Sequence, residues 1–313
     1  MKPGRRPRIA RVPPALRPGD RIGIAAPAGP VRREPLESGM SYLRGRGFDL
    51  LPGDHLFERR AYLAGDDAGR LGDLNRLLAD RTVKAVWYAR GGYGSARIVE
   101  GVDFGPLAAR PKALVGYSDS TVLHAAAFRA QRLVTYYGPN VSDLGNAESF
   151  DEASLWRALE GDENESPGAE ESLAGATVLR EGRAEGTLVG GCLSLLASLA
   201  GTPLQVSGDG AIFFWEEIAE EPYRIDRMLG QLRQCGSLEG IRGMIVGQTV
   251  ACRAKEPAND LPIPEILARH LGKARIPVVL GLAAGHGPHK ITLPLGRRAL
   301  LDTSSAALRF TGR

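Results

Sequence analysis

The chain has 313 residues, of which 43% are hydrophobic and 24% are charged, and these proportions are ordinary for a folded globular protein. They exclude a disordered chain and a fibrous repeat. The formal net charge is +4, but no basic stripe with interleaved aromatic residues is present, so we do not expect nucleic-acid binding. Glycine is abundant, with 40 residues, which predicts many tight turns or close approaches of the backbone to a ligand.

The first 14 residues are basic and rich in proline, and we expect residues 1–14 to form a disordered basic tail. They lack the apolar stretch of a secretory signal. The longest uncharged stretch, residues 186–208, is interrupted by glycine, proline and hydroxyl residues, so we expect no membrane span. The three cysteines are scattered and form no C-x-x-C pair, which indicates reduced thiols in the cytoplasm and no zinc site.

The next segment, residues 15–145, alternates apolar runs with helical patterns. Buried strands are predicted at residues 21–26, 83–89 and 113–116, and helices at residues 33–46, 67–80 and 119–131. Strands that alternate with helices predict a doubly wound parallel sheet covered on both faces. This segment is the predicted N-terminal domain.

The rest of the chain predicts a linker and a second domain. Residues 146–185 are acidic and contain proline and glycine, which favours a solvated linker. Within the second domain, residues 186–313, we expect strands at 211–215, 241–247 and 277–280, helices at 223–235 and 263–271, and a terminal hairpin at 291–310. The predicted fold class is therefore α/β, an N-terminal doubly wound parallel-sheet domain plus a C-terminal α/β domain, with the active site in the cleft between them.

A candidate nucleophile follows one of the predicted strands. Ser118 lies between the strand at 113–116 and the following helix, at the edge of the sheet where α/β proteins bind ligands. The free N–H groups at the start of that helix suit a developing oxyanion, as do those of the glycine-rich loop at residues 91–94. The alternatives are a helix cap formed by Ser118 or Asp119 and a structural turn at the loop. The second glycine of the G-x-S-x-G motif is missing.

A base and an acid also follow predicted strands. His286 lies in a glycine-rich loop between Gly285 and Gly287, which leaves its imidazole open, whereas the other histidines lie in a turn, on helices or later in the same loop. Glu216 and Glu217 directly follow the strand at 211–215, and only one of them can face the cleft because side chains alternate along a strand. Serine, histidine and one glutamate at strand ends would form a triad. The alternatives are an ordinary loop histidine and a solvated strand end.

Six sequence blocks extend the argument beyond single motifs. They are GDRIGIAAPAGP (19–30), ARGGYGSARI (89–98), LVGYSDSTVLHAA (114–126), GGCLSLLASLAGTP (190–203), FFWEEIAEEPYRIDRMLGQL (213–232) and GHGPHKITLPLG (285–296). In this order they resemble the LD-carboxypeptidases, or muramoyltetrapeptide carboxypeptidases. This serine peptidase family also includes the microcin C self-immunity proteins. The resemblance covers residues 15–305.

The resemblance implies a function and a site. The expected reaction is hydrolysis of the L,D-peptide bond that releases the terminal D-alanine of muropeptide tetrapeptides during peptidoglycan recycling. The implied catalytic triad is Ser118, His286 and Glu216, and the implied oxyanion hole consists of the backbone N–H groups of Gly92 and Asp119. The family further implies a cytoplasmic homodimer with no metal and no organic cofactor. Activity should fall at low pH, because the neutral imidazole is the base.

Two departures from the family pattern concern the second domain. Cys192 stands where many members have asparagine, and Trp215-Glu216-Glu217 stands where the usual pattern is Leu-Glu-Asp. Cys192 is expected to be a small packed residue rather than a nucleophile. The residues expected to contact substrate are Tyr117, Cys192 and Arg224, although an ion pair is an equally good interpretation of Arg224.

Three other functions remain open. One is a microcin-immunity-type serine amidase that cleaves peptidyl or aminoacyl nucleotides. Another is an α/β-hydrolase esterase, which the missing G-x-S-x-G motif disfavours. The last is a peptidoglycan-fragment binding protein without activity, which an intact triad disfavours.

Overall fold

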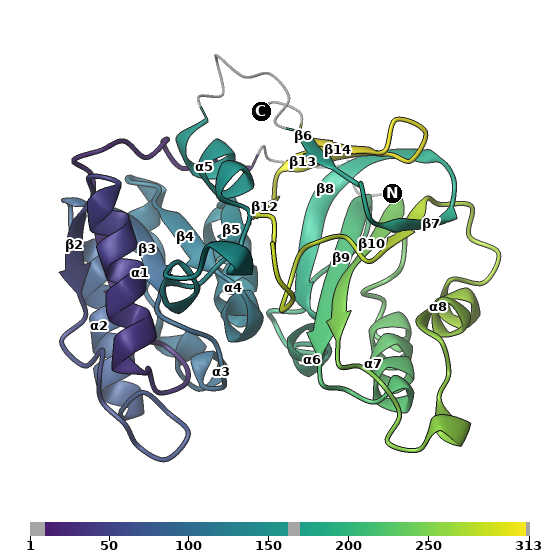
Figure 1. Cartoon of the computed structure of the whole chain (residues 1–313), viewed down its shortest axis with the longest axis horizontal. Coiled ribbons are helices and arrows are strands. Elements are labelled where there is room, and N and C mark those ends of the chain that lie inside the picture. The colour runs from purple at the N-terminus through teal and green to yellow at the C-terminus, as the bar shows by residue number, and fades with distance from the viewer. Residues whose placement is uncertain (1–9, 162–169, 311–313) are drawn as a thin grey trace, which may run out of the picture.

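The computed structural model describes residues 10–161 and 170–310, and these residues form two β-sheets that lie side by side (Figure 1). The first sheet has the strand order β12-β5-β4-β3-β1-β2. Its strands are β1 (Arg21–Ala25), β2 (Asp49–Pro52), β3 (Val83–Tyr88), β4 (Ala113–Gly116), β5 (Thr135–Tyr137) and β12 (Leu293–Leu295). Strands β1 to β5 are parallel and β12 is antiparallel to β5. The order reverses direction between β1 and β3, so the loops that follow these two strands diverge to opposite sides.

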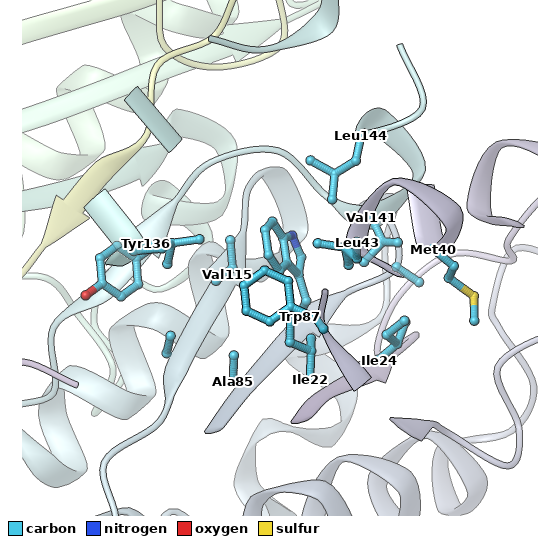
Figure 2. Close-up of a cluster of buried hydrophobic side chains, with 14 of the residues drawn as sticks. Ile22, Ile24, Met40, Leu43, Ala85, Trp87, Val115, Tyr136, Val141 and Leu144 are labelled. Carbon is cyan, nitrogen blue, oxygen red and sulfur yellow. The ribbon is translucent and has the colours of Figure 1, made fainter. Parts of the chain in front are cut away.

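Helices cover both faces of the first sheet. Successive side chains of its strands point to opposite faces, so each face has its own hydrophobic cluster. Residues of α1 and α5 share one hydrophobic cluster with the strands, and residues of α2, α3 and α4 share the other. Their bounds are α1 (Arg33–Gly45), α2 (Asp67–Ala79), α3 (Ser95–Ile98), α4 (Thr121–Gln131) and α5 (Glu152–Glu160). Trp87 lies at the centre of the first cluster, beside Ile22, Ile24 and Val115 (Figure 2).

The second sheet has the order β6-β14-β13-β8-β9-β10-β11-β7 and a parallel centre, β8 to β11. Its strands are β6 (Glu170–Ser172), β7 (Thr177–Arg180), β8 (Arg183–Cys192), β9 (Ala211–Ile218), β10 (Gly243–Val250), β11 (Val278–Leu280), β13 (Arg298–Asp302) and β14 (Ala307–Phe310). One face packs against α6 (Leu193–Ser198), α7 (Pro222–Gln234) and α8 (Ile263–Leu271). The other face packs against β12 and Tyr137 of the first sheet. The predicted α/β fold class is confirmed.

The connections contain short 3-10 helices, and one of them carries Ser118. In the described residues these helices are Val99–Gly101, Gly105–Ala108, Ser118–Ser120, Val141–Asp143, Ala147–Ser149 and Pro257–Asn259. No helix within residues 10–161 and 170–310 is both long and apolar enough to cross a membrane.

Strand β12 differs from its prediction. We expected residues 291–310 to form a terminal hairpin, but only β13 and β14 pair in that way. Strand β12 instead joins the first sheet, where Leu293 lies opposite Tyr137 and Leu295 opposite Thr135 (Figure 1). Local patterning could not reveal this pairing, because its partner lies more than 150 residues earlier in the chain.

The predicted linker and tail also differ in part from the structure. Residues 146–185 include helix α5, whose Leu155, Trp156 and Leu159 are buried in the first core, and also β6 and β7 of the second sheet. Of the acidic residues that suggested a solvated linker, Glu152 lies exposed on α5, whereas Glu171 of β6 is buried, at 4% exposure. Residues 1–9 of the predicted tail lie outside the described residues. Arg11 already belongs to the fold, because its backbone bonds to Arg132 and Val134.

Candidate active site

The turn after β4 places Ser118 at the carboxyl edge of the first sheet. Ser118 has a backbone φ of +66°, a left-handed conformation that non-glycine residues rarely adopt. Strain of this kind persists where the surrounding structure fixes it, commonly at functional sites. Here the backbone N–H of Ser118 donates to the hydroxyl of Tyr137 at 3.1 Å, and its carbonyl accepts from the Thr121 hydroxyl at 2.7 Å. The strained turn therefore projects the Ser118 side chain without the second glycine of the G-x-S-x-G motif.

Three side chains form a continuous hydrogen-bonded chain. Oγ of Ser118 lies 3.0 Å from Nε2 of His286, and Nδ1 of the same imidazole lies 2.7 Å from Oε2 of Glu216. Since the carboxylate of Glu216 can only accept at Nδ1, that nitrogen carries the proton and Nε2 is free to accept the proton of the serine hydroxyl. Glu216 is fully buried, at 0% exposure. The structure thus brings together the three residues predicted for the triad, from both sheets.

The loop that carries His286 is tied to the second sheet. The backbone N–H of His286 donates to Oε2 of Glu216 at 3.2 Å, and that of Gly287 donates to Oε1 of Gln248 at 2.9 Å. Gly285 has a φ of +121°, and a Cβ at this position would lie 2.4 Å from Oε2 of Glu216. Only glycine therefore lets the loop close over the carboxylate.

The two glutamates after the apolar run of β9 have different surroundings. Glu216 faces His286 and Tyr137, whereas Glu217 accepts hydrogen bonds from the backbone N–H groups of Ser194 at 2.7 Å and Ile218 at 2.9 Å. Burial raises the pKa of Glu217, although these two N–H groups oppose the shift. The alternation of side chains along β9 therefore gives one glutamate to the candidate site and the other to the start of α6.

The backbone groups predicted for the oxyanion hole belong to the serine turn and to the glycine loop beside it. A Cβ added to Gly91 would lie 2.8 Å from Cβ of Ser118 and 3.7 Å from the backbone nitrogen of Asp119, so the glycine loop contacts the serine turn directly. Gly92 lines the same cavity as Ser118 and His286. Within the described residues, the N–H groups of Gly92 and Asp119 donate to no protein acceptor. Their lack of a protein partner is what an oxyanion hole requires, and their role there stays a prediction.

The side chain of Asp119 has a separate, structural role. Its Oδ2 accepts the backbone N–H of Ser95 at 2.7 Å, which ties the serine turn to the first residue of α3. Burial raises the pKa of this carboxyl, and the hydrogen bonds from Ser95 oppose the shift. The link fixes the glycine loop relative to Ser118, because the loop leads directly into α3.

The cavity at Ser118 has a volume of about 410 Å³ and carries charges of both signs. Arg32 and Arg90 line its wall, as does Asp143, whose pKa is raised by burial. Tyr117, which was predicted to contact substrate, also lines the cavity, with its ring 4.9 Å from that of His286. Arg32, Arg90 and Asp143 were not predicted from the sequence. Arg90 directly follows a predicted strand, so a search for charged residues at strand ends could have found it.

Cys192 and Arg224, the other predicted substrate contacts, do not line this cavity. Cys192 is 2% exposed, its backbone N–H donates to the Thr121 hydroxyl at 3.0 Å, and burial raises the pKa of its thiol well above the usual range. It therefore is a packed residue, as its small apolar character suggested. Arg224 is exposed and contacts Tyr223 and Glu220 on its own helix and the preceding turn. The expectation that these two side chains contact substrate is not supported by their positions.

Two hydroxyl groups connect the halves of the site. The Tyr137 hydroxyl donates to Oε1 of Glu216 at 2.6 Å, and Thr121 links the carbonyl of Ser118 to the backbone N–H of Cys192. Sequence reasoning missed both residues. Tyr137 ends a short strand just before a Gly-Pro pair, and that position was the available signal.

Comparisons with known proteins identify the family. The family model described as "LD-carboxypeptidase N-terminal domain" matches residues 22–138, and the one described as "LD-carboxypeptidase C-terminal domain" matches residues 185–301. The chain is 38% identical to a probable murein peptide carboxypeptidase of Bacillus subtilis over 295 residues, which cover 93% of this chain and 92% of the relative.

Solved structures agree with this match. The structure of a muramoyltetrapeptide carboxypeptidase from Oxalobacter formigenes is similar with a TM-score of 0.80 and 31% identity, over 94% of this chain and 99% of that one. The microcin C7 self-immunity protein MccF has a TM-score of 0.89 at 22% identity, over 96% of this chain and 98% of that one, and so shares the fold. From the two family models and the similarity to carboxypeptidases along almost its whole length, the chain belongs to the LD-carboxypeptidase family of serine peptidases.

Proposed function

We propose that this enzyme hydrolyses the peptide bond before the terminal D-alanine of muropeptide tetrapeptides, with Ser118, His286 and Glu216 as its catalytic triad. The observation that carries the proposal is the unbroken hydrogen-bonded chain from Oγ of Ser118 through the imidazole to Oε2 of Glu216. A serine hydroxyl is a weak nucleophile unless an oriented base accepts its proton, and this chain supplies both the base and its orientation.

The proposed reaction proceeds through an acyl-enzyme. Oγ of Ser118 attacks the scissile carbonyl carbon while Nε2 of His286 takes the hydroxyl proton. Glu216 stabilises the resulting imidazolium, and the N–H groups of Gly92 and Asp119 bind the oxyanion. The imidazolium then gives its proton to the leaving amino group of D-alanine. A water molecule, activated by the same imidazole, hydrolyses the ester and restores the serine.

The charges in the cavity support a substrate with several carboxylates. Arg32 and Arg90 line the wall, and arginine side chains pair well with carboxylates. The terminal D-alanine and the acidic residues of a murein peptide provide such groups. The names of the relatives, a murein peptide carboxypeptidase and a muramoyltetrapeptide carboxypeptidase, point to the same substrate class.

The decisive experiment offers two substrates side by side and identifies the products by mass spectrometry. One is a tetrapeptide that ends in D-alanine, and the other is an aminoacyl nucleotide. We expect D-alanine release from the first, and loss of that release in the Ser118→Ala variant. Cleavage of the nucleotide alone would assign the microcin-type amidase, for which the fold shared with MccF is the only support. Release at the wild-type rate by Ser118→Ala would refute the proposed nucleophile.

Three further expectations remain predictions of the family resemblance: a cytoplasmic location, a homodimer and the absence of a cofactor. Light scattering coupled to size exclusion distinguishes a dimer from a monomer. Dialysis against a chelator followed by the D-alanine assay tests the last of them, and we expect unchanged turnover.

A further inference from the structure

A second hollow opens beside the cavity at Ser118. It has a volume of about 910 Å³, and Arg90 and Gly92 line both spaces. We call it the tyrosine hollow after Tyr62 and Tyr93, which form its aromatic wall. A substrate bound at Ser118 can therefore extend past the glycine loop into the tyrosine hollow without leaving the protein surface.

The position of the tyrosine hollow in the sheet is that of a ligand site. Gly29 and Pro30 of its wall follow β1, and Arg90 and Tyr93 follow β3. The strand order of the first sheet reverses between β1 and β3. In open α/β sheets, the loops at such a reversal separate and leave a crevice at the carboxyl ends of the strands, where ligands bind.

Hydrogen bonds fix the base of the tyrosine hollow. The backbone N–H of Gly29 donates to the carbonyl of Gly91 at 3.1 Å, and that of Ala64 donates to the carbonyl of Ala28 at 3.0 Å. The guanidinium of Arg70, which is only 2% exposed, donates to the carbonyls of the loops after β1 and β3. These bonds join the three segments of the wall, so the hollow is formed before any ligand arrives.

The aromatic rings of the hollow face solvent. Tyr62 is 61% exposed and Tyr93 49%, and their centroids lie 5.8 Å apart with an interplanar angle of 56°. Ala61, next to Tyr62, has a left-handed φ of +54°, so the loop keeps a strained residue at the point that presents this ring. Exposed aromatic faces of this kind stack against flat apolar surfaces, and the C–H face of a pyranose ring is one.

The charge of the hollow complements an acidic peptide. Arg59 and Arg90 both line it, and neither forms an ion pair within residues 10–161 and 170–310. Arg90 donates only to the carbonyl of Pro30, at 2.9 Å. A muropeptide joins an acidic peptide to an amino sugar, so its carboxylates match the guanidinium groups and its sugar matches the tyrosines.

We propose that the tyrosine hollow binds the sugar-bearing end of a muropeptide, with a pyranose ring against Tyr62 and Tyr93 and a peptide carboxylate at Arg59. The inference rests on the proposed function, because it assigns the part of the same substrate that lies away from the scissile bond. It makes Tyr62 and Tyr93 residues that select sugar-linked tetrapeptides over free ones.

The test compares kcat/KM for D-alanine release from a free tetrapeptide and from the same tetrapeptide linked to N-acetylmuramic acid. In the wild-type enzyme we expect the sugar-linked substrate to be favoured about tenfold, and in the double variant Tyr62→Ala/Tyr93→Ala we expect this preference to vanish. The double variant Tyr62→Phe/Tyr93→Phe keeps the aromatic faces and should retain the preference. The control is Tyr223→Ala, which removes a tyrosine of similar exposure, 56%, outside both spaces and should also retain it.

Two results would overturn the proposal: equal kcat/KM for the two substrates in the wild-type enzyme, or a preference that survives loss of both rings. A third result separates this proposal from the proposed function. If neither substrate releases D-alanine, the proposed function fails. The tyrosine hollow is then tested by calorimetry, which measures the affinity of the Ser118→Ala protein for N-acetylmuramyl tetrapeptide. Binding weakened about tenfold by adding the two tyrosine substitutions would still support the tyrosine hollow, and unchanged or absent binding would refute it.

Discussion

The hydroxyl of Tyr137 lies 2.6 Å from Oε1 of Glu216, on a different carboxylate oxygen from the one that contacts His286. The same hydroxyl accepts the backbone N–H of Ser118. One phenol from the first sheet thus fixes both the backbone of the candidate nucleophile and the carboxylate that orients the base. Tyr137 is a positioning residue in this arrangement, since its hydroxyl bonds to the triad and not to the reacting atoms.

Tyr137→Phe should lower kcat about tenfold to a hundredfold with little change in KM, because both Oε1 of Glu216 and the N–H of Ser118 lose their buried partner. The free energy of unfolding should fall by about 1–3 kcal/mol. Steady-state kinetics and urea unfolding measure the two effects. Tyr42→Phe is the matched control, because Tyr42 donates to Glu152 at the same 2.6 Å but lies away from the site. A Tyr137→Phe enzyme with wild-type kcat would show that the phenol has no positioning role.

The two adjacent glutamates give a second prediction. Glu216→Gln keeps the size of the side chain but removes the charge that stabilises the imidazolium, so kcat should fall on the order of a thousandfold or more. Glu217→Gln should leave kcat within about tenfold of wild type, because Glu217 bonds to the N–H groups of Ser194 and Ile218 rather than to His286. Rates of D-alanine release measure both. Equal losses in the two variants would contradict the assignment of Glu216.

Gly91 gives a steric prediction. A Cβ at this position would lie 2.8 Å from Cβ and 2.9 Å from Oγ of Ser118, closer than side-chain atoms approach one another. Gly91→Ala should therefore displace the serine side chain and lower kcat about a hundredfold. Gly72→Ala is the control, since a Cβ on this exposed helical glycine meets nothing within 4 Å and should stabilise the protein by about 1 kcal/mol. Full activity of Gly91→Ala would mean that the loop moves aside at no cost.

The buried imidazole of His124 should make the free energy of unfolding depend on pH. Burial lowers the pKa of His124 to about 4, whereas the imidazole in an unfolded chain titrates near its ordinary value of about 6.5. Because the folded protein binds this proton less tightly, the contribution of His124 is fully present above pH 6.5 and is lost as the pH falls toward 4. Between pH 7 and pH 5 the loss is about 2 kcal/mol.

Urea unfolding of His124→Gln at pH 7 and pH 5 checks this, and the variant should lose about 2 kcal/mol less than the wild type over that interval. His289→Asn serves as control, because this exposed histidine has a φ of +49°, which asparagine tolerates. If the wild type and His124→Gln lost equal stability between the two pH values, the buried imidazole would not be the group responsible.

Much of the site can be predicted from the sequence because Ser118, Glu216 and His286 each follow a run of apolar residues. In a parallel sheet such positions gather at one edge, and here the site joins such a position of the first sheet to those of the second. The alternation of side chains along a strand shows that only one of Glu216 and Glu217 can face the cleft, but not which one. The family resemblance selects Glu216. Tyr137 escapes prediction because its role depends on a strand of the first sheet meeting a strand of the second, a contact that no local pattern encodes.

The helices and strands can also be predicted in large part from the sequence. Strands and helices with continuous apolar runs or helical spacing, such as β3 and α2, match their predicted bounds within one or two residues. Helix α5 was missed because acidic residues dominate its segment, although the spacing of Leu155, Trp156 and Leu159 is that of one helical face. Strand β12 was misplaced because the packing between the two sheets, rather than its own sequence, decides which sheet it joins.

Strand β12 belongs to the first sheet, although it follows β11 of the second sheet in the chain. This placement has a consequence for attempts to divide the protein into two fragments. The loop with His286 leaves the second sheet at β11 and enters the first sheet at β12, so the base is anchored in both halves of the chain. A truncated protein ending at residue 161 would expose the edge of β5, and open strand edges of this kind invite intermolecular pairing. Co-expression of two fragments split within residues 162–169 would instead keep β12 available, so complementation in trans should restore a complete sheet and, with it, the serine–histidine contact.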